Sequence, residues 1–254
     1  MRELVVYNFT EDHYSVITLN RPNKHNAISI SMANELKRAI EQAKEDGGKF
    51  LVIQSINGDV FCAGGDLKDF HSDLSEEQVF PQLYKMKEVL TELISFPVPT
   101  ICLLSGDAYG GGCELATACD IRIAKENTKF GFVQSNLGIL PGWGGGALLY
   151  EKVHSSFALR WLMEGSVFSS SYLHKQGWIH QEVPEDQWDE KGILKAYITK
   201  TREQMTFLKT QYKENLSSLS LSAKMNEEVR LCSTLWGSQK HKQAIESILN
   251  KTNS

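Results

Sequence analysis

The segment at residues 100–104, with the residues that follow it, constrains the fold of this chain most strongly. Its letters, Thr-Ile-Cys-Leu-Leu, form a compact apolar run, which is typical of a strand buried in a sheet. Gly110 to Gly112 come next, directly before a short apolar helical segment that carries one carboxylate, Glu114. Glycines at such a junction let backbone N–H groups point at a ligand, and the helix N-terminus adds about half a positive charge. The junction therefore predicts a site for a developing oxyanion, with an acid or base beside it.

The rest of the chain alternates strand patterns with helix patterns. Strands are predicted at 4–9, 14–19, 50–53, 100–104 and 121–124, and helices at 32–43 and 79–94. From about residue 154 onward the pattern is almost entirely helical. Because helices between strands act as crossover connections, the strands are expected to pair largely in parallel. The sequence thus predicts an α/β core over residues 1–190 and a helical C-terminal part over 191–254.

Composition narrows the class of protein. A chain of 254 residues with 41% hydrophobic residues is expected to form one large domain with a substantial core. The net charge of −4, without a basic cluster, argues against a nucleic-acid partner. The opening residues resemble a strand rather than a signal peptide, and no apolar run reaches the ~18 residues of a membrane span. We therefore expect no membrane partner. The five cysteines form no C-x-x-C pair, so we expect buried free thiols and a cytoplasmic location.

A second glycine turn follows the predicted strand at 50–53. It reads Val60-Phe-Cys-Ala-Gly-Gly-Asp-Leu-Lys68, again with small residues before a helix-like segment. Taken alone, either turn is explained equally well as an ordinary connection between a strand and a helix. Together they can supply one N–H group each to a single oxygen, and Glu114 lies beside one of them, which favours the interpretation as a functional site.

Four ordered motifs run through most of the chain. They are Leu19-Asn-Arg-Pro-Asn-Lys-His-Asn-Ala-Ile28, residues 61–67, residues 110–120, and residues 130–145, the last containing Leu137-Gly-Ile-Leu-Pro-Gly-Trp-Gly-Gly145. In these motifs the chain resembles the crotonase (enoyl-CoA hydratase/isomerase) superfamily over roughly residues 3 to 185. The resemblance implies a crotonase spiral of β-β-α turns that binds acyl-CoA. It also implies that the helical region at 191–254 covers the active site and builds a homotrimer or a dimer of trimers.

The resemblance also assigns roles to single residues. Members of this superfamily stabilise a thioester enolate between two backbone N–H groups, which by motif are those of Gly65 and Gly111. The substrate-binding positions implied are Lys24, Ala27, Cys62, Ala63, Asp66, Leu67, Lys68 and Trp143. Coenzyme A enters as part of the substrate, so no separate cofactor is expected. None of the seven histidines stands in a metal-ligand pattern such as H-E-x-x-H, so no metal is expected. The thiols of Cys62 and Cys113 are expected to pack rather than to react.

The acids of the site are where the chain departs from the superfamily pattern. Hydratases of this family usually carry two glutamates, and the first corresponds to Glu114. The position of the second is Gln134, and an amide cannot shuttle a proton at neutral pH. General acid–base catalysis contributes ~10²–10⁴-fold to a rate, so a two-glutamate mechanism is expected to be impaired.

Decarboxylation makes smaller demands on the site. The oxyanion hole takes up the enolate charge as CO₂ leaves, and one acid, Glu114, protonates the α-carbon. Residues 141–145 (Pro-Gly-Trp-Gly-Gly) and 235–237 (Leu-Trp-Gly) are most similar to an ethylmalonyl-CoA decarboxylase-like branch of the superfamily. The leading hypothesis is therefore decarboxylation of a short (alkyl)malonyl-CoA. A hydratase or double-bond isomerase that uses Glu114, and a non-catalytic acyl-CoA-binding protein, remain as alternatives.

Overall fold

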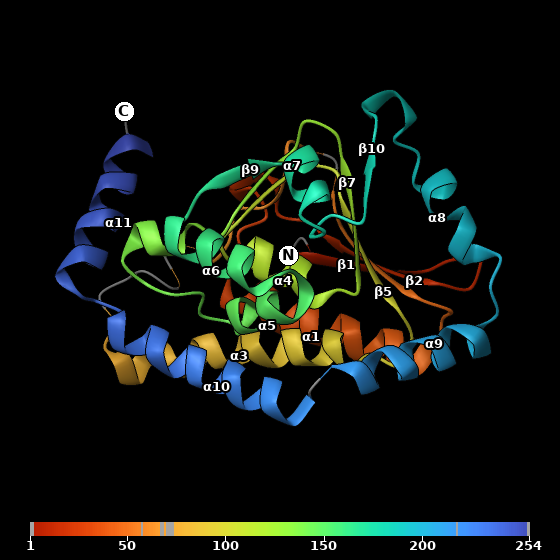
Figure 1. The fold of residues 1–254 in the computed structure, drawn as a ribbon, viewed down its shortest axis with the longest axis horizontal. Coiled ribbons are helices and arrows are strands. Elements are labelled where there is room, and N and C mark those ends of the chain that lie inside the picture. The colour runs from red at the N-terminus through yellow and green to blue at the C-terminus, as the bar shows by residue number, and fades with distance from the viewer. Residues whose placement is uncertain (1–2, 57, 67–68, 70–73, 217, 253–254) are drawn as a thin grey trace.

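The larger sheet organises the fold (Figure 1). The computed structural model describes residues 3–56, 58–66, 69, 74–216 and 218–252. Within them the larger sheet has six strands, in the order β1 (Val5–Phe9), β2 (Ser15–Leu19), β3 (Leu51–Ser55), β5 (Thr100–Leu104), β7 (Ile121–Lys125) and β10 (Gln181–Val183). Only the first pair of this order is antiparallel, so the expected parallel pairing is confirmed.

A smaller sheet lies beside the larger one. Its strands, in order, are β4 (Val60–Cys62), β6 (Asp107–Tyr109), β8 (Lys129–Gly131) and β9 (Val167–Ser169). Along the chain, strands of the two sheets alternate in pairs: β3 is followed by β4, β5 by β6, and β7 by β8. After each such pair the chain turns into a helical segment, which gives the repeating β-β-α turn of the expected spiral.

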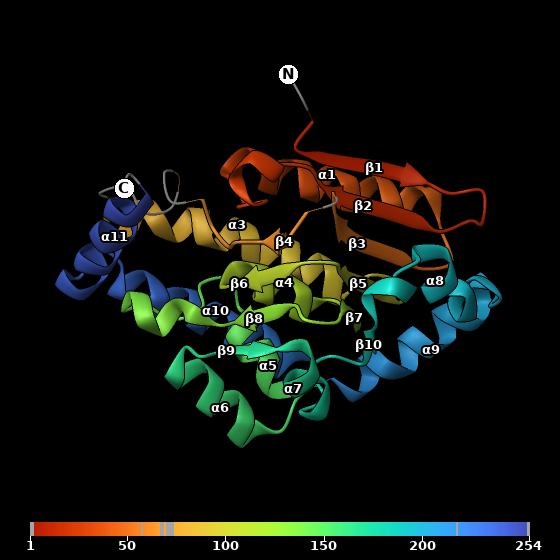
Figure 2. The ribbon, with the colours of Figure 1, turned by 90° about the horizontal axis from the view of Figure 1, so that it is seen from above.

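Two long helices cover one face of the larger sheet (Figure 2). α1 (Ile30–Asp46) begins where the Ser29 side chain accepts the Met32 N–H at 3.1 Å, and it ends at Gly47, whose φ is 66°. α3 (Glu76–Ile94) begins with a capping box formed by Ser75 and Gln78. α1 packs against α3, and α3 packs against α10. Both helices lie where the apolar periodicity predicts them, although each is longer than predicted.

The C-terminal half contains short strands that the sequence does not predict. β9 pairs antiparallel with β8, and β10 pairs parallel with β7, inside a region expected to be almost entirely helical. Each strand has three residues, which is too short to show a period of two. The helices of this half are α5 (Gly145–Lys152), α6 (Ser155–Glu164), α7 (Ser170–Lys175), α8 (Glu190–Ile198), α9 (Arg202–Asn215), α10 (Ser218–Leu235) and α11 (Gln239–Thr252). Among the described residues, no helix is long and apolar enough to cross a membrane.

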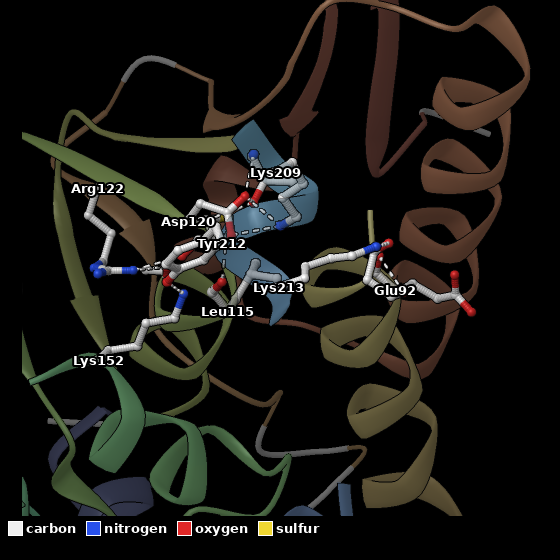
Figure 3. Close-up of polar contacts among 12 residues, drawn as sticks. Glu92, Leu115, Asp120, Arg122, Lys152, Lys209, Tyr212 and Lys213 are labelled. Carbon is white, nitrogen blue, oxygen red and sulfur yellow. Dashed lines mark hydrogen bonds and ion pairs between the residues drawn. The ribbon is translucent and has the colours of Figure 1, made fainter. Parts of the chain in front are cut away.

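Charged side chains fasten α9 to the core (Figure 3). Lys209 of α9 donates to the two carboxylate oxygens of Asp120, at 2.7 and 2.6 Å, and its side chain is only 1% exposed. Asp120 also accepts the backbone N–H of Thr100 at 2.9 Å, which ties the ion pair to β5. Nearby, Lys152 of α5 donates to the hydroxyl of Tyr212 on α9 at 2.6 Å. The C-terminal helices therefore pack on the same body as the sheets.

Candidate active site

A cavity of about 870 Å³ opens where the two glycine turns meet. β4 and β6 pair in parallel, with Cys62 opposite Ala108, so the turns that follow these strands lie next to each other. The cavity is also lined by residues between 21 and 27, by residues between 133 and 143, by Trp236 just after α10, and by Ile248 and Leu249 of α11. Segments far apart in the sequence thus enclose one space.

Two backbone N–H groups are presented at this cavity. Ile28 donates its N–H to the Gly64 carbonyl at 2.8 Å, and it accepts the Asp66 N–H at 2.9 Å. Gly65 and Ile28 form a parallel bridge in which both hydrogen bonds are made by the two neighbours of Gly65, so the N–H of Gly65 itself points away from Ile28. Gly111 is the first residue of α4 (Gly111–Ala118), so its N–H lacks an acceptor within the helix. The structure therefore places both predicted oxyanion donors in the wall of one cavity.

The Trp143 indole lies directly against Gly111. A Cβ added to Gly111 would lie 2.2 Å from two carbon atoms of the indole, so only glycine fits this position. Trp143 is itself buried and lines the cavity. The aromatic ring thus fixes the backbone that carries one donor, and it narrows the space beside that donor.

Glu114 is the carboxylate of the site, and it is 1% exposed. Its Oε2 accepts the backbone N–H groups of Trp143 and Gly145, both at 2.9 Å. Its Oε1 accepts the N–H of Gly142 at 3.3 Å and the side-chain amide of Gln134 at 3.0 Å. Burial raises the pKa of Glu114 to about 7, and the hydrogen bonds only partly oppose this rise. A carboxyl whose pKa is raised in this way is suited to giving and taking a proton near neutral pH.

Gln134 occupies the position where a second acid is expected. It lies in the short 3₁₀ segment η2 (Val133–Leu137) and is 6% exposed. Its Nε2 donates to Glu114, whereas its buried Oε1 has no hydrogen-bond partner among the described residues. The pair predicted from the motif is thus in contact, with an acid on one side and a neutral amide on the other.

Comparisons with known proteins decide the family. A family model for enoyl-CoA hydratase/isomerase matches residues 10–254. The chain belongs to this family. It is 32% identical over 197 residues to the mitochondrial methylglutaconyl-CoA hydratase of Mus musculus, a match that covers 76% of this chain and 62% of that protein. It is 34% identical over 172 residues to the mitochondrial enoyl-CoA hydratase domain-containing protein 2 of Mus musculus, covering 67% of this chain and 58% of that protein. These matches span about three-fifths of the length of the relatives.

Solved structures agree with the family membership. The crystal structure of an enoyl-CoA hydratase from Bacillus halodurans superimposes with a TM-score of 0.87 at 25% identity, covering 96% of this chain and all 100% of that one. The expected crotonase fold is therefore confirmed. The closer similarity to decarboxylase-like members stays a prediction.

The other residues assigned by the enoyl-CoA hydratase/isomerase pattern divide into three groups. Residues at the cavity are Lys24, Ala27, Ala63, Asp66 and Trp143. Cys62 is fully buried and is not among the cavity-lining residues; burial raises the pKa of its thiol to about 12. Leu67 and Lys68 lie outside the described residues. No group of three or more His, Cys, Asp or Glu residues in the described ranges could hold a metal ion.

One half-buried acid is not predicted from the sequence. Glu228 of α10 accepts the backbone N–H of Gly146 at 3.0 Å and that of Ala147 at 2.5 Å. Burial, together with the nearby charge of Glu114, raises the pKa of Glu228 well above its usual value. The available signal was its place on the helix face that also carries the buried residues Met225 and Cys232, three and four positions away.

Proposed function

We propose that this protein binds acyl-CoA thioesters and decarboxylates a short alkylmalonyl-CoA. The observation that carries this proposal is the contact between Glu114 and Gln134. The site offers one buried acid that holds a proton near neutral pH, and a neutral amide faces it where a two-glutamate hydratase would have its second acid.

The proposed reaction uses this arrangement in two steps. The thioester oxygen accepts the N–H groups of Gly65 and Gly111, while the bond between the α-carbon and the carboxylate breaks. CO₂ leaves, and the electron pair of that bond forms the enolate, whose oxygen is stabilised by the two donors. Glu114 then gives its proton to the α-carbon, which yields the shortened thioester, and it recovers a proton from solvent.

The surroundings of Gln134 suit a substrate that carries a carboxylate. When Glu114 is protonated, the side-chain amide of Gln134 can rotate by 180°. Its Oε1 then accepts a hydrogen bond from the protonated Glu114, and its Nε2 donor points toward the cavity. Such a donor can bind the substrate carboxylate, whereas a second glutamate would repel it. Apolar cavity residues such as Ile139 and Leu140 favour loss of the charged group, because an ionised carboxylate is poorly stabilised there.

A hydratase is the second candidate, and the names of the relatives favour it. Both mouse relatives are named as hydratases or as enoyl-CoA hydratase domain proteins. In this candidate Glu114 alone would activate water for addition to an enoyl-CoA.

The proposal is tested by a panel of thioesters with wild-type protein and the variant Glu114→Gln. CO₂ release is followed with malonyl-, methylmalonyl- and ethylmalonyl-CoA, and water addition with crotonyl-CoA. We expect CO₂ release to exceed hydration and to fall ~10²-fold or more in the variant. The exposed substitution Glu227→Gln is the control and should change neither activity. Faster hydration than decarboxylation would support the hydratase, and thioester binding without turnover would identify a binding protein.

A further inference from the structure

Two carboxylates are bound to the N-terminus of the same helix, α5. Gly145, Gly146 and Ala147 are its first three residues, and their N–H groups have no acceptors within the helix. Gly145 donates to Glu114, and the next two donate to Glu228. The positive end of the helix dipole favours negative charge at this point.

The close approach of both side chains depends on the two glycines. A Cβ added to Gly145 would lie 2.4 Å from the Cβ of Glu114, and one added to Gly146 would lie 2.5 Å from Oε2 of Glu228. The two glutamates thus reach the helix terminus from α4 and α10 because these positions carry no side chain. The two glycines that begin α5 therefore have a structural explanation in this pair of acids.

No cation neutralises the pair. In the portion of the chain that the structure describes, neither carboxylate forms an ion pair with lysine, arginine or histidine. Other titratable groups on the packed elements include Cys113 on α4, Cys232, Lys224, Glu227 and Arg230 on α10, Tyr150, Glu151 and Lys152 on α5, and Lys87 on α3. Lys224 is paired with Glu151 at 2.9 Å, and Lys87 lies over the ring of Tyr84 at 5.1 Å.

We propose that Glu228 is a positioning residue that holds one proton jointly with Glu114 and so keeps that proton available at the reaction centre. Two like charges in a buried site oppose each other's ionisation, so such a pair loses its protons in two separated steps. Burial raises the pKa of both carboxyls, and the charge of Glu114 raises that of Glu228 further. This inference rests on the proposed function for its effect on turnover, but the shared proton does not depend on the reaction.

Titration followed by NMR tests the shared proton without any substrate. Protein labelled with ¹³C at the glutamate carboxyls is titrated as wild type, Glu114→Gln and Glu228→Gln. Exposed glutamates ionise well below neutrality, so the last carboxyl to ionise belongs to the pair. We expect this last ionisation to move to lower pH in both variants, by about one unit or more. If the two acids were independent, one of the variants would retain the wild-type value, and that result would overturn the proposal.

Matched variants distinguish the effect of losing an acid of the pair from the effect of any substitution nearby. Glu227 is the neighbour of Glu228 on α10 but is exposed and paired with Arg230, so Glu227→Gln should leave the last ionisation unchanged. Glu228→Asp keeps a carboxyl and should restore part of the upward shift. If Glu228→Gln does not fold, the resonance of Glu228 itself is followed in wild type and in Glu114→Gln; coupling requires its ionisation to fall in the variant, and an unchanged value would overturn the proposal.

Turnover supplies the second measurement. In Glu228→Gln, the pH at which CO₂ release declines on the alkaline side should fall with the NMR value, while KM for the thioester stays within about twofold. If the NMR titrations show coupling but no CO₂ is released, the shared proton is supported and the proposed decarboxylase function is rejected. CO₂ release with an unchanged alkaline decline in Glu228→Gln would reject the positioning role of Glu228.

Discussion

Gln134 and Glu114 lie in the same wall of the cavity, joined by one hydrogen bond of 3.0 Å. Replacing Gln134 with Glu would place a second carboxylate beside the first and toward the substrate. Because like charges repel, we expect CO₂ release from ethylmalonyl-CoA to fall at least about tenfold. Water addition to crotonyl-CoA should rise, since two acids are then available. Gln134→Leu, which adds no acid, is the control and should not gain hydration. An increase in CO₂ release in Gln134→Glu would contradict this account.

Gly111 offers a test of the oxyanion donors. Gly111→Ala must displace either the Trp143 indole or the backbone N–H, because the new Cβ would lie 2.2 Å from the ring. Loss of one oxyanion donor typically costs ~10²–10³ in kcat, and we expect a loss of that size. Gly58→Ala, where the nearest other atom would be 3.8 Å away, serves as the control in the same assay. Full activity of Gly111→Ala would exclude its N–H as a donor.

At the scale of residues, the sequence predicts the site where its parts are contiguous. Glu114 and Gly111 share one motif, and the position of Gln134 follows from a second motif. Glu228 escaped prediction because its role depends on how α10 packs against α5, which no local pattern records. Its hydrogen bonds from the N–H groups of Gly146 and Ala147 likewise depend on the three-dimensional position of the α5 N-terminus, which the sequence does not give.

The ion pair between Lys209 and Asp120 is the most buried of the polar contacts described above between α9 and the core. Lys209→Met would leave the carboxylate of Asp120 buried without its cation. Breaking a buried pair in this way typically costs ~3–5 kcal/mol of unfolding free energy, and we expect a loss of that order in denaturant titrations. Lys213→Met on the same helix removes only a surface bond to the Ser95 carbonyl and should cost under about 1 kcal/mol. Equal stability of the two variants would contradict the anchoring role.

Elements with enough residues to show a period are predicted well. The predicted helices at 32–43 and 79–94 lie within α1 and α3, and the strand at 100–104 coincides with β5. The three-residue strands of the smaller sheet are not predicted, because so few residues carry neither a period nor a full set of turn signals. β4, β6 and β8 pair with one another because they follow β3, β5 and β7, which already lie side by side in the larger sheet.

At the level of the whole chain, the C-terminal helix α11 forms one wall of the cavity. Ile248 and Leu249 of α11 line the cavity, although the other walls come from the first 143 residues and Trp236. The double variant Ile248→Ala/Leu249→Ala keeps good helix formers but removes this apolar wall. We expect KM for the thioester to rise about tenfold, which corresponds to ~1.4 kcal/mol, with little change in kcat. Phe207→Ala/Leu208→Ala on α9, away from the cavity, is the control and should leave KM unchanged.

Two expectations about the whole molecule stay predictions. The homotrimer or dimer of trimers concerns contacts beyond this single chain. The cytoplasmic location is a prediction from the five cysteines, which are buried and free. The mouse relatives are named as mitochondrial proteins.

In the proposed reaction, CO₂ loss leaves an enolate, and Glu114 protonates it inside the cavity. The most direct test of this step is the decarboxylation of ethylmalonyl-CoA in D₂O, followed by analysis of the butyryl-CoA product. We predict one deuterium at the α-carbon in a single configuration, because a fixed acid delivers it to one face. Absence of product would contradict decarboxylation, and racemic deuterium would show that solvent rather than Glu114 supplies the proton.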